Sequence, residues 1–241
     1  MKPEYVYGRR AVRELLRGPR EVLELWATER ALASEAWLRD EPRLRVQVKQ
    51  ERALTAACET RDHQGVLAYC EPYRYADAHE LAAAPSPMLV CLDRVSDPRN
   101  LGAVCRAAEC AGASGVVLPE HGSARVTPVV CRTSAGAVEH LPVGVVTNLA
   151  RYLDEVKRPR LWVWAAVAEA STPLWDADLA GGVAFVLGAE GRGLRPLVRK
   201  ACDEEVAIPL GGRVSSLNVS VAAALLLFEA RRQRAAVGVA R

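Results

Sequence analysis

The stretch Leu89-Val-Cys-Leu-Asp-Arg-Val-Ser-Asp-Pro-Arg-Asn-Leu-Gly-Ala-Val-Cys-Arg106 decides the fold class, because it combines a buried strand, a loop and the start of a helix. Leu89–Leu92 is apolar throughout, as in a strand covered on both faces. Asp97-Pro98 is a turn signal, and Asn100 stands where a helix N-cap is expected. Small residues in the following helix allow close packing or the approach of a substrate. A unit of this kind indicates an α/β protein.

The same alternation continues to the end of the chain. We expect strands at Leu89–Leu92, Val116–Leu118, Val143–Val146, Leu161–Ala165, Val183–Leu187 and Glu205–Ile208, and helices at Leu101–Ala111, Thr147–Val156, Pro196–Lys200 and Val219–Arg234. Apolar strands that alternate with helices predict a mostly parallel sheet covered on both faces. The last helix is apolar on nearly every side, so it should be buried by the sheet, by a partner subunit, or by both.

The first 72 residues predict a smaller α/β domain. Here we expect helices at Gly8–Arg17, Ser34–Arg39 and Gln50–Cys58, and strands at Val22–Ala27, Leu44–Val48 and Val66–Cys70. Residues 73–87 are predicted to be a linker, because Pro85 and Pro87 rule out a continuing helix or central strand. Residues 88–241 would then form the second domain.

Composition excludes several classes of protein. The chain has 241 residues and a net charge of only +3, so bulk charge gives no argument for a nucleic-acid partner. No apolar segment resembles a signal peptide or a membrane span, so we expect a cytoplasmic location. The seven cysteines show no Cys-x-x-Cys and no Cys/His pair at ligand spacing, so we expect neither a metal site nor a disulfide framework. The basic residues are almost all Arg, which suits phosphate binding but equally a GC-rich genome.

Three separated blocks look like parts of one site: Asn100–Arg106, Gly188–Gly193 and Ile208–Ser220. Each lies near the end of a predicted strand, where open α/β sheets bind their ligands. The second block has the spacing Gly-x-x-Gly-x-Gly, which is not the dinucleotide fingerprint and excludes a dehydrogenase of that type. The blocks supply amides, hydroxyls, an Arg and Glu190, and this set of side chains is suited to binding a nucleotide and a cofactor. We therefore expect a group-transfer enzyme.

Each block also has a purely structural interpretation. Asn100 can be a plain cap and Arg106 a solvated helix residue, and the glycines can form an ordinary turn after a strand. One of Ser216 and Asn218 is expected to cap the last helix. At the other end of the chain, Arg9, Arg13 and Arg17 share one helix face. This stripe is either an RNA-binding surface or a solvated face.

Together the blocks resemble the three motifs of the SpoU/TrmH family of the SPOUT superfamily. The likeness extends to Thr133–Val143, to Tyr7-Gly8 with the apolar residues after it, and to His63-Gln64-Gly65-Val66. The resemblance implies an S-adenosylmethionine-dependent RNA ribose 2′-O-methyltransferase. It also implies an α/β SPOUT domain with a deep trefoil knot, an N-terminal RNA-binding domain similar to L30e and L7Ae, and a homodimer. It is strongest to members that methylate a guanosine in the peptidyl-transferase region of 23S rRNA.

The resemblance also assigns roles to residues. Those that would line the cofactor pocket are Leu187, Gly188, Ile208, Leu217 and Asn218, and those that would form the catalytic and RNA-gripping set are Asn100, Arg106, Glu190, Ser216 and Asn218. Arg106 is the family's candidate for activating the 2′-hydroxyl. Arg is effectively always protonated and is a poor base, so holding phosphate and stabilising negative charge on the 2′-oxygen suit it better. Glu190 would orient Arg106 or accept the proton.

Two alternatives stay open at this point. One is the same chemistry on tRNA or on another rRNA position. The other is a non-catalytic RNA-binding or ribosome-assembly factor built on a retired methyltransferase fold. Loss of Asn100, Arg106 or Glu190 would favour the factor, and all three are present.

Overall fold

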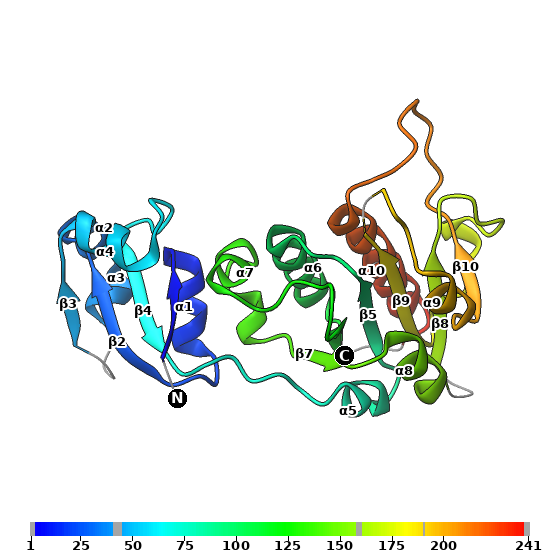
Figure 1. The fold of residues 1–241 in the computed structure, drawn as a ribbon, viewed down its shortest axis with the longest axis horizontal. Coiled ribbons are helices and arrows are strands. Elements are labelled where there is room, and N and C mark those ends of the chain that lie inside the picture. The colour runs from blue at the N-terminus through cyan, green and yellow to red at the C-terminus, as the bar shows by residue number, and fades with distance from the viewer. Residues whose placement is uncertain (1–2, 41–44, 158–160, 190, 239–241) are drawn as a thin grey trace. The chain divides into compact units, whose positions relative to one another are not determined.

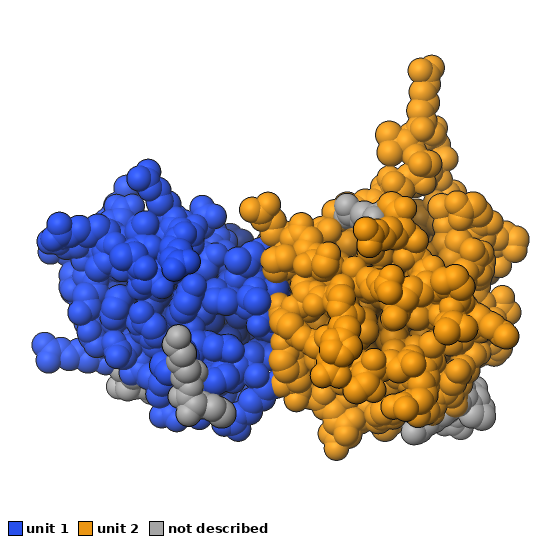
Figure 2. Space-filling model, in the orientation of Figure 1, with its two compact units in different colours: residues 1–74, 126–140 blue, residues 75–125, 141–241 orange. Residues whose placement is uncertain are grey.

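The chain forms two compact units in the computed structural model, which describes residues 3–40, 45–157, 161–189 and 191–238 (Figures 1 and 2). The first unit consists of Met1–Arg74 and Val126–His140, and the second of Tyr75–Arg125 and Leu141–Arg241. The segment Val126–His140 therefore groups with the N-terminal part of the chain, although it lies inside the predicted second domain.

The first unit is built on a four-stranded sheet in the order β1-β4-β2-β3. β1 and β2 both pair with β4 antiparallel, and β2 pairs with β3 parallel. Its elements are β1 Glu4–Tyr7, α1 Arg9–Arg17, β2 Val22–Ala27, α2 Glu29–Ser34, α3 Ala36–Arg39, β3 Val46–Val48, α4 Glu51–Cys58, β4 Val66–Cys70, α7 Pro128–Thr133 and the 3-10 helix η1 Ala137–Glu139. The sequence pattern predicted neither β1 nor α2, and the predicted helix Ser34–Arg39 corresponds to α3.

Segment 126–140 is fixed to the rest of the first unit by packing and by charge. α7 packs against β1, and η1 packs against α1. The Glu139 carboxylate is buried and accepts a hydrogen bond from Nε of buried Arg20 at 2.9 Å. A buried ion pair of this kind is costly to break, because either partner alone would be an uncompensated charge.

The second unit is built on a six-stranded sheet in the order β10-β8-β9-β5-β6-β7, and every neighbouring pair is parallel. Its strands are β5 Met88–Asp93, β6 Gly115–Pro119, β7 Val143–Val146, β8 Leu161–Ala166, β9 Gly182–Gly188 and β10 Glu204–Val206. Its helices are α5 Ala78–Ala83, α6 Pro98–Ala111, α8 Leu149–Val156, η2 Leu174–Asp176, α9 Pro196–Lys200 and α10 Val219–Ala236. The prediction of an α/β fold with a parallel sheet is confirmed.

Helices cover both faces of this sheet. Buried residues of α5, α8 and α9 share one core with Leu89 and Cys91 of β5. Val90 and Leu92 point to the opposite face and are also fully buried. On the α6 and α10 side, the two helices pack against each other and against β6 and β9 (Figure 1). The trefoil knot implied by the resemblance stays a prediction.

The segment predicted as a linker is largely part of the second unit. Residues 78–83 form α5, with Ala78 and Ala82 buried in the core beneath α8. The Tyr152 hydroxyl donates a hydrogen bond to the Ala78 carbonyl at 2.8 Å, which fixes α5 further. Pro85 and Pro87 stand after the helix, where a proline is tolerated. Within the described part of the chain, no helix is long and apolar enough to cross a bilayer.

Candidate functional site

The three sequence blocks start at one edge of the second unit's sheet. Because all neighbouring strands are parallel, the carboxyl ends of β5 at Asp93, β9 at Gly188 and β10 at Val206 share that edge. Asp93 and Gly188 are direct partners in the strand register. This is the edge at which α/β sheets bind ligands.

The first block begins α6, but Asn100 is not its cap. Asp97 is the N-cap, and its Oδ1 accepts a hydrogen bond from the Arg99 N–H at 2.7 Å. Pro98 occupies the first helical position, which suits a residue that lacks an N–H. The expectation that Asn100 caps the helix is therefore wrong. Asn100 lies in the first turn, where its side chain is available for another contact.

That contact is with Asn218. The Asn218 Nδ2 donates a hydrogen bond to Asn100 Oδ1 at 2.9 Å, which joins residues separated by 118 positions. Asn218 is also the N-cap of α10, as its Oδ1 accepts from the N–H and the hydroxyl of Ser220 at 2.8 and 2.6 Å. The expected cap is therefore confirmed. One amide fixes the start of α10 and connects it to α6.

Arg106 lies on α6 away from this pair. At about 100° per residue, six residues turn the helix through about 240° from Asn100, so the two side chains leave α6 in different directions. Arg106 is exposed, and its guanidinium makes no hydrogen bond or ion pair with the residues that the structure describes. Its charge is therefore available to an external anion.

The second block is a tight loop after β9. Leu187 is buried in the strand, while Gly188 is partly exposed. A Cβ on Gly188 would lie 2.2 Å from the carbonyl carbon of Gly193, so only glycine fits there. The loop closes as Gly193 N–H donates to the Ala189 carbonyl at 2.9 Å. Glu190 lies outside the described residues.

The third block follows β10, which ends at Val206 rather than at the predicted Ile208. Ala207 leaves the sheet to bridge with Pro173, and its N–H donates to the Thr172 carbonyl at 2.9 Å. Ile208 and Leu217 are partly buried, and Ser216 is exposed. The structure thus joins Asn100 to Asn218 directly. It places Leu187 and Gly188 at the end of β9, and Ile208, Ser216 and Leu217 on the segment between β10 and α10.

Sequence reasoning missed Asp93 and Arg195 at this edge. Asp93 is fully buried and pairs with Arg195, whose Nη2 lies 2.7 Å from its Oδ1. The available signal was an acidic residue that ends an otherwise apolar strand. No group of three His, Cys, Asp or Glu side chains in the described part of the chain has the geometry to hold a metal ion.

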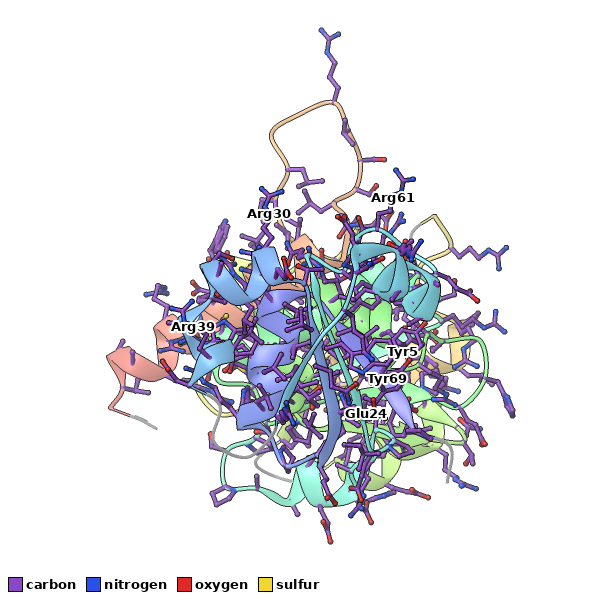
Figure 3. All side chains as sticks on the ribbon, turned by 90° about the vertical axis from the view of Figure 1, so that its left-hand side faces the viewer. Tyr5, Glu24, Arg30, Arg39, Arg61 and Tyr69 are labelled. Carbon is purple, nitrogen blue, oxygen red and sulfur yellow. The ribbon has the colours of Figure 1, made fainter. Side chains whose placement is uncertain are left out.

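A second candidate site lies in the first unit, where the parallel strands β2 and β3 end. The groove is lined by Arg9, Thr28, Glu29, Arg30, Val48, Lys49, Gln50, Glu51, Arg61, His63, Gln64 and Gly65. Its cationic side chains outnumber its carboxylates. Figure 3 shows Arg30, from α2, and Arg61, from the turn after α4, at the same edge of the unit. Both are exposed, and neither forms an ion pair with a described residue.

The predicted Arg stripe on α1 is divided between different environments. The Arg9 side chain enters the groove, where its Nε donates to the Gln64 carbonyl at 3.1 Å and its Nη1 pairs with Glu35 at 2.8 Å. Arg13 is exposed, and exposed Arg17 pairs with Glu14 at 2.9 Å. Only the first residue of the stripe therefore contributes to the groove.

Comparison with known proteins agrees with this geometry. The model of the SpoU rRNA Methylase family matches residues 87–228, and that of the RNA 2′-O ribose methyltransferase substrate-binding domain matches residues 5–76. The chain is 39% identical over 246 residues to the 23S rRNA (guanosine-2′-O-)-methyltransferase RlmB of Shewanella oneidensis, an alignment that covers 97% of this chain and 98% of that protein. It is 40% identical over 250 residues to RlmB of Pseudomonas syringae, covering 97% of each.

Solved structures show the same relationship. The SpoU methyltransferase AviRb from Streptomyces viridochromogenes, in complex with the cofactor AdoMet, superposes with a TM-score of 0.80 at 25% identity, covering 97% of this chain and 91% of that one. The TrmH/SpoU tRNA modifying enzyme of A. aeolicus superposes with a TM-score of 0.56 and covers 66% of this chain. With a family model over more than half of its length and relatives near 40% identity, this chain belongs to the SpoU rRNA methylase family.

Proposed function

We propose that this enzyme transfers a methyl group from S-adenosylmethionine to the ribose 2′-oxygen of a guanosine in the peptidyl-transferase region of 23S rRNA. The observation that carries the proposal is the Asn100–Asn218 hydrogen bond, which unites the first and third blocks at the ligand-binding edge of the sheet. The RlmB relatives, aligned over nearly their full length, support this RNA as the substrate. The tRNA enzyme covers only 66% of this chain, which favours rRNA over tRNA.

The proposed cofactor site uses neutral groups. It would consist of apolar side chains, one amide and the backbone of two loops. The residues are Leu187, Gly188, Ile208, Leu217 and Asn218. This set fits a ligand with an adenine ring, a ribose and a methionine tail, because such pockets are mostly apolar with a few polar groups. The close return of the loop onto Gly188 leaves backbone groups as the surface available there. When bound, the cofactor supplies an electrophilic methyl group on a positively charged sulfur.

The proposed catalytic set combines one permanent positive charge, that of Arg106, with the neutral amides of Asn100 and Asn218. Arg106 holds a phosphate of the RNA and stabilises negative charge that develops on the 2′-oxygen. Asn100 and Asn218 orient the ribose, and Ser216 contributes a hydroxyl. Glu190 orients Arg106 or accepts the proton from the 2′-hydroxyl.

Methyl transfer provides the test of this proposal. Tritiated S-adenosylmethionine should label 23S rRNA at one guanosine ribose, as mapped by alkaline hydrolysis and primer extension. Arg106→Ala should lower kcat by about a hundredfold while leaving cofactor affinity nearly unchanged, because loss of one electrostatic contact to the reacting group has that size. Arg106→Lys should rescue poorly, since one ammonium cannot make a bidentate grip.

Other outcomes would contradict specific parts of the proposal. Label in tRNA or at another rRNA position would reject the substrate assignment. No label in any RNA would favour an assembly factor. Loss of cofactor binding in Arg106→Ala, with normal turnover at saturating cofactor, would make Arg106 a pocket residue.

We also propose that residues 1–72 bind the RNA, and that residues 88–241 carry the chemistry after a connection at 73–87. The proposed RNA surface combines the stripe of Arg9, Arg13 and Arg17 with the basic groove. Arg30 and Arg61 are its best candidates for phosphate contacts, because they are exposed and free of ion pairs with described residues. The family model for substrate binding over residues 5–76 supports this assignment.

Two double variants separate the groove from the stripe. Removal of each side chain that binds a phosphate of single-stranded RNA should lower the slope of log affinity against log salt by about 0.7. Arg30→Ala/Arg61→Ala should therefore weaken binding to a 23S rRNA fragment and flatten its salt dependence more than Arg13→Ala/Arg17→Ala does. A larger effect of the second pair would assign the RNA contacts to the stripe. No effect of either pair would reject the RNA-binding role of this surface.

We also propose that the protein acts as a homodimer in the cytoplasm. α10 leaves Val221, Leu225 and Phe228 exposed on one side, at 47, 37 and 47% of their full surface. Their spacing of four and three residues makes a continuous apolar stripe on a helix. A second copy of the chain is the proposed cover for this stripe.

A further inference from the structure

Asp93, the last residue of β5, places a carboxylate inside the second unit. It is completely buried. Arg195 donates two hydrogen bonds to it, from the backbone N–H to Oδ2 at 2.9 Å and from Nε to Oδ1 at 2.8 Å, and the Nη2 of the same guanidinium forms an ion pair with Oδ1 at 2.7 Å. A buried carboxylate requires such compensation, and charge-assisted hydrogen bonds are the strong ones. The Asp93–Arg195 ion pair is therefore held rigidly at the ligand-binding edge of the sheet.

Asp93 anchors both ends of the Gly-rich loop. At the start, Gly188 is its neighbour in the strand register. At the end, Arg195 binds its carboxylate. Between them the loop folds back, since Gly193 N–H bonds the Ala189 carbonyl at 2.9 Å. The Asp93–Arg195 pair thus holds the described end of the loop, residues 191–195, beside the strand end at Gly188.

The backbone at Arg195 suits this closure. Pro196 follows it and restricts it to an extended conformation, observed as φ −63° and ψ 144°. In that conformation the N–H and the guanidinium of Arg195 reach the same carboxylate. Arg195 is also the N-cap residue of α9, so it joins the loop to a helix whose Val198 is buried in the core.

We infer that the Asp93–Arg195 pair is a positioning clamp that holds residues 191–195 against Gly188 in the arrangement that binds the cofactor. The inference rests on the proposed cofactor role of Gly188. Neither residue is assigned a contact with the reacting atoms. The clamp acts through the loop, so its loss should weaken cofactor binding even where the protein stays folded.

The test distinguishes an effect of the clamp on cofactor affinity from the loss of stability that an unpaired buried charge causes. In Arg195→Ala, Asp93 is left without compensation, so both the melting temperature and the affinity for S-adenosylmethionine should fall. The dissociation constant, measured by calorimetry, should rise about tenfold, as expected for removal of charge-assisted hydrogen bonds. Asp93→Asn/Arg195→Gln removes both charges and should recover most of the melting temperature, while cofactor affinity stays weak. Arg195→Lys should keep the charge but not the affinity, because an ammonium lacks the forked geometry.

A matched control lies on the same helix. Arg199 of α9 pairs with Glu205 of β10, Nη2 to Oε2 at 2.7 Å, so its side chain is partly exposed and bonds a strand residue rather than the loop. Arg199→Ala should leave cofactor affinity at the wild-type value. Wild-type affinity in Arg195→Ala would overturn the clamp, as would recovery of both melting temperature and affinity in the charge-free double variant.

Failure of the site assignment itself has a different signature. Gly188→Val should abolish cofactor binding, because the new side chain would overlap the backbone of Gly193. Unchanged binding in Gly188→Val would reject the cofactor site at this loop, and the clamp with it. Abolished binding in Gly188→Val together with wild-type binding in Arg195→Ala would reject the clamp alone.

Discussion

At the scale of single residues, the Asn218 side chain has two roles, as the N-cap of α10 and as the hydrogen-bond partner of Asn100. Its type and its place before an apolar helix predict a cap, and the structure contains that cap. The hydrogen bond to Asn100 could not be predicted, because it depends on how α10 packs against α6. For the same reason, no local pattern pairs Asp93 with Arg195, which lies 102 residues later.

His63 carries a prediction about pH. It is 1% exposed. Its Nδ1 accepts the Gly65 N–H at 3.0 Å, so the ring proton is on Nε2, 3.0 Å from the Thr55 hydroxyl. Burial lowers the pKa of His63 below its ordinary value of 6.5, against a smaller opposite effect of Glu51 and Asp62. In the folded state the ring thus remains neutral at a pH where the unfolded chain already binds a proton.

The sign of the effect follows from that difference. Below about pH 6.5 the unfolded state gains a proton that the folded state does not, so the free energy of unfolding falls as pH decreases. The loss ends once pH is below the folded pKa. Denaturant unfolding between pH 5 and pH 8 should show this slope in the wild type and a smaller one in His63→Gln. The exposed His121→Gln serves as a control and should keep the wild-type slope. Equal slopes in all three proteins would contradict the assignment.

At the scale of elements, a strand is most easily predicted from the sequence when both faces of its sheet are covered. The apolar runs of the second unit gave β5 to β9 nearly at their observed bounds, because a strand covered on both faces must be apolar throughout. β10, of sequence Glu-Glu-Val at the sheet edge, has no such run and ends two residues before its predicted bound. β1, of sequence Glu-Tyr-Val-Tyr, pairs only with β4 at the edge of its sheet and has no such run. α7 has six residues, too few to show a helical period.

α10 carries the prediction about assembly. Its exposed stripe of Val221, Leu225 and Phe228 is the proposed dimer surface. Leu225→Lys/Phe228→Lys should place two charges in that surface and produce a monomer near 26.1 kDa in light scattering, where the wild type should have twice that mass. Leu197→Lys, at a leucine that is 73% exposed on α9, should remain dimeric. A monomeric wild type, or a dimeric double variant, would reject this surface.

At the scale of the whole molecule, the two units are not consecutive in sequence. The chain leaves the first unit after Arg74 and returns to it for Val126–His140. Composition and periodicity placed this segment in the second domain, because sequence order is the only guide when contacts are unknown. What fixes it in the first unit is the buried Arg20–Glu139 pair and the packing of α7 on β1. Such partners are invisible until the fold is known.

This division predicts the result of a truncation. A chain of residues 75–241 keeps segment 126–140 but removes the partners that bury it. Val130, Cys131 and Val138 are each at most 2% exposed, and exposing a side chain of this size costs about 1.5–3 kcal/mol. Glu139 would also lose the guanidinium of Arg20. The truncated protein should therefore melt at a lower temperature than the full chain and aggregate during gel filtration.

A substituted truncation tests the cause. Replacing Val130, Cys131 and Val138 by Ser in residues 75–241 removes the exposed apolar surface, and it should restore a single sharp peak in gel filtration. The same three substitutions in the full chain should destabilise it, because there the side chains are buried. If the unsubstituted truncation is monodisperse and melts like the full chain, segment 126–140 does not depend on residues 1–74. The second unit would then be an independent domain in the simple order that the sequence pattern predicts.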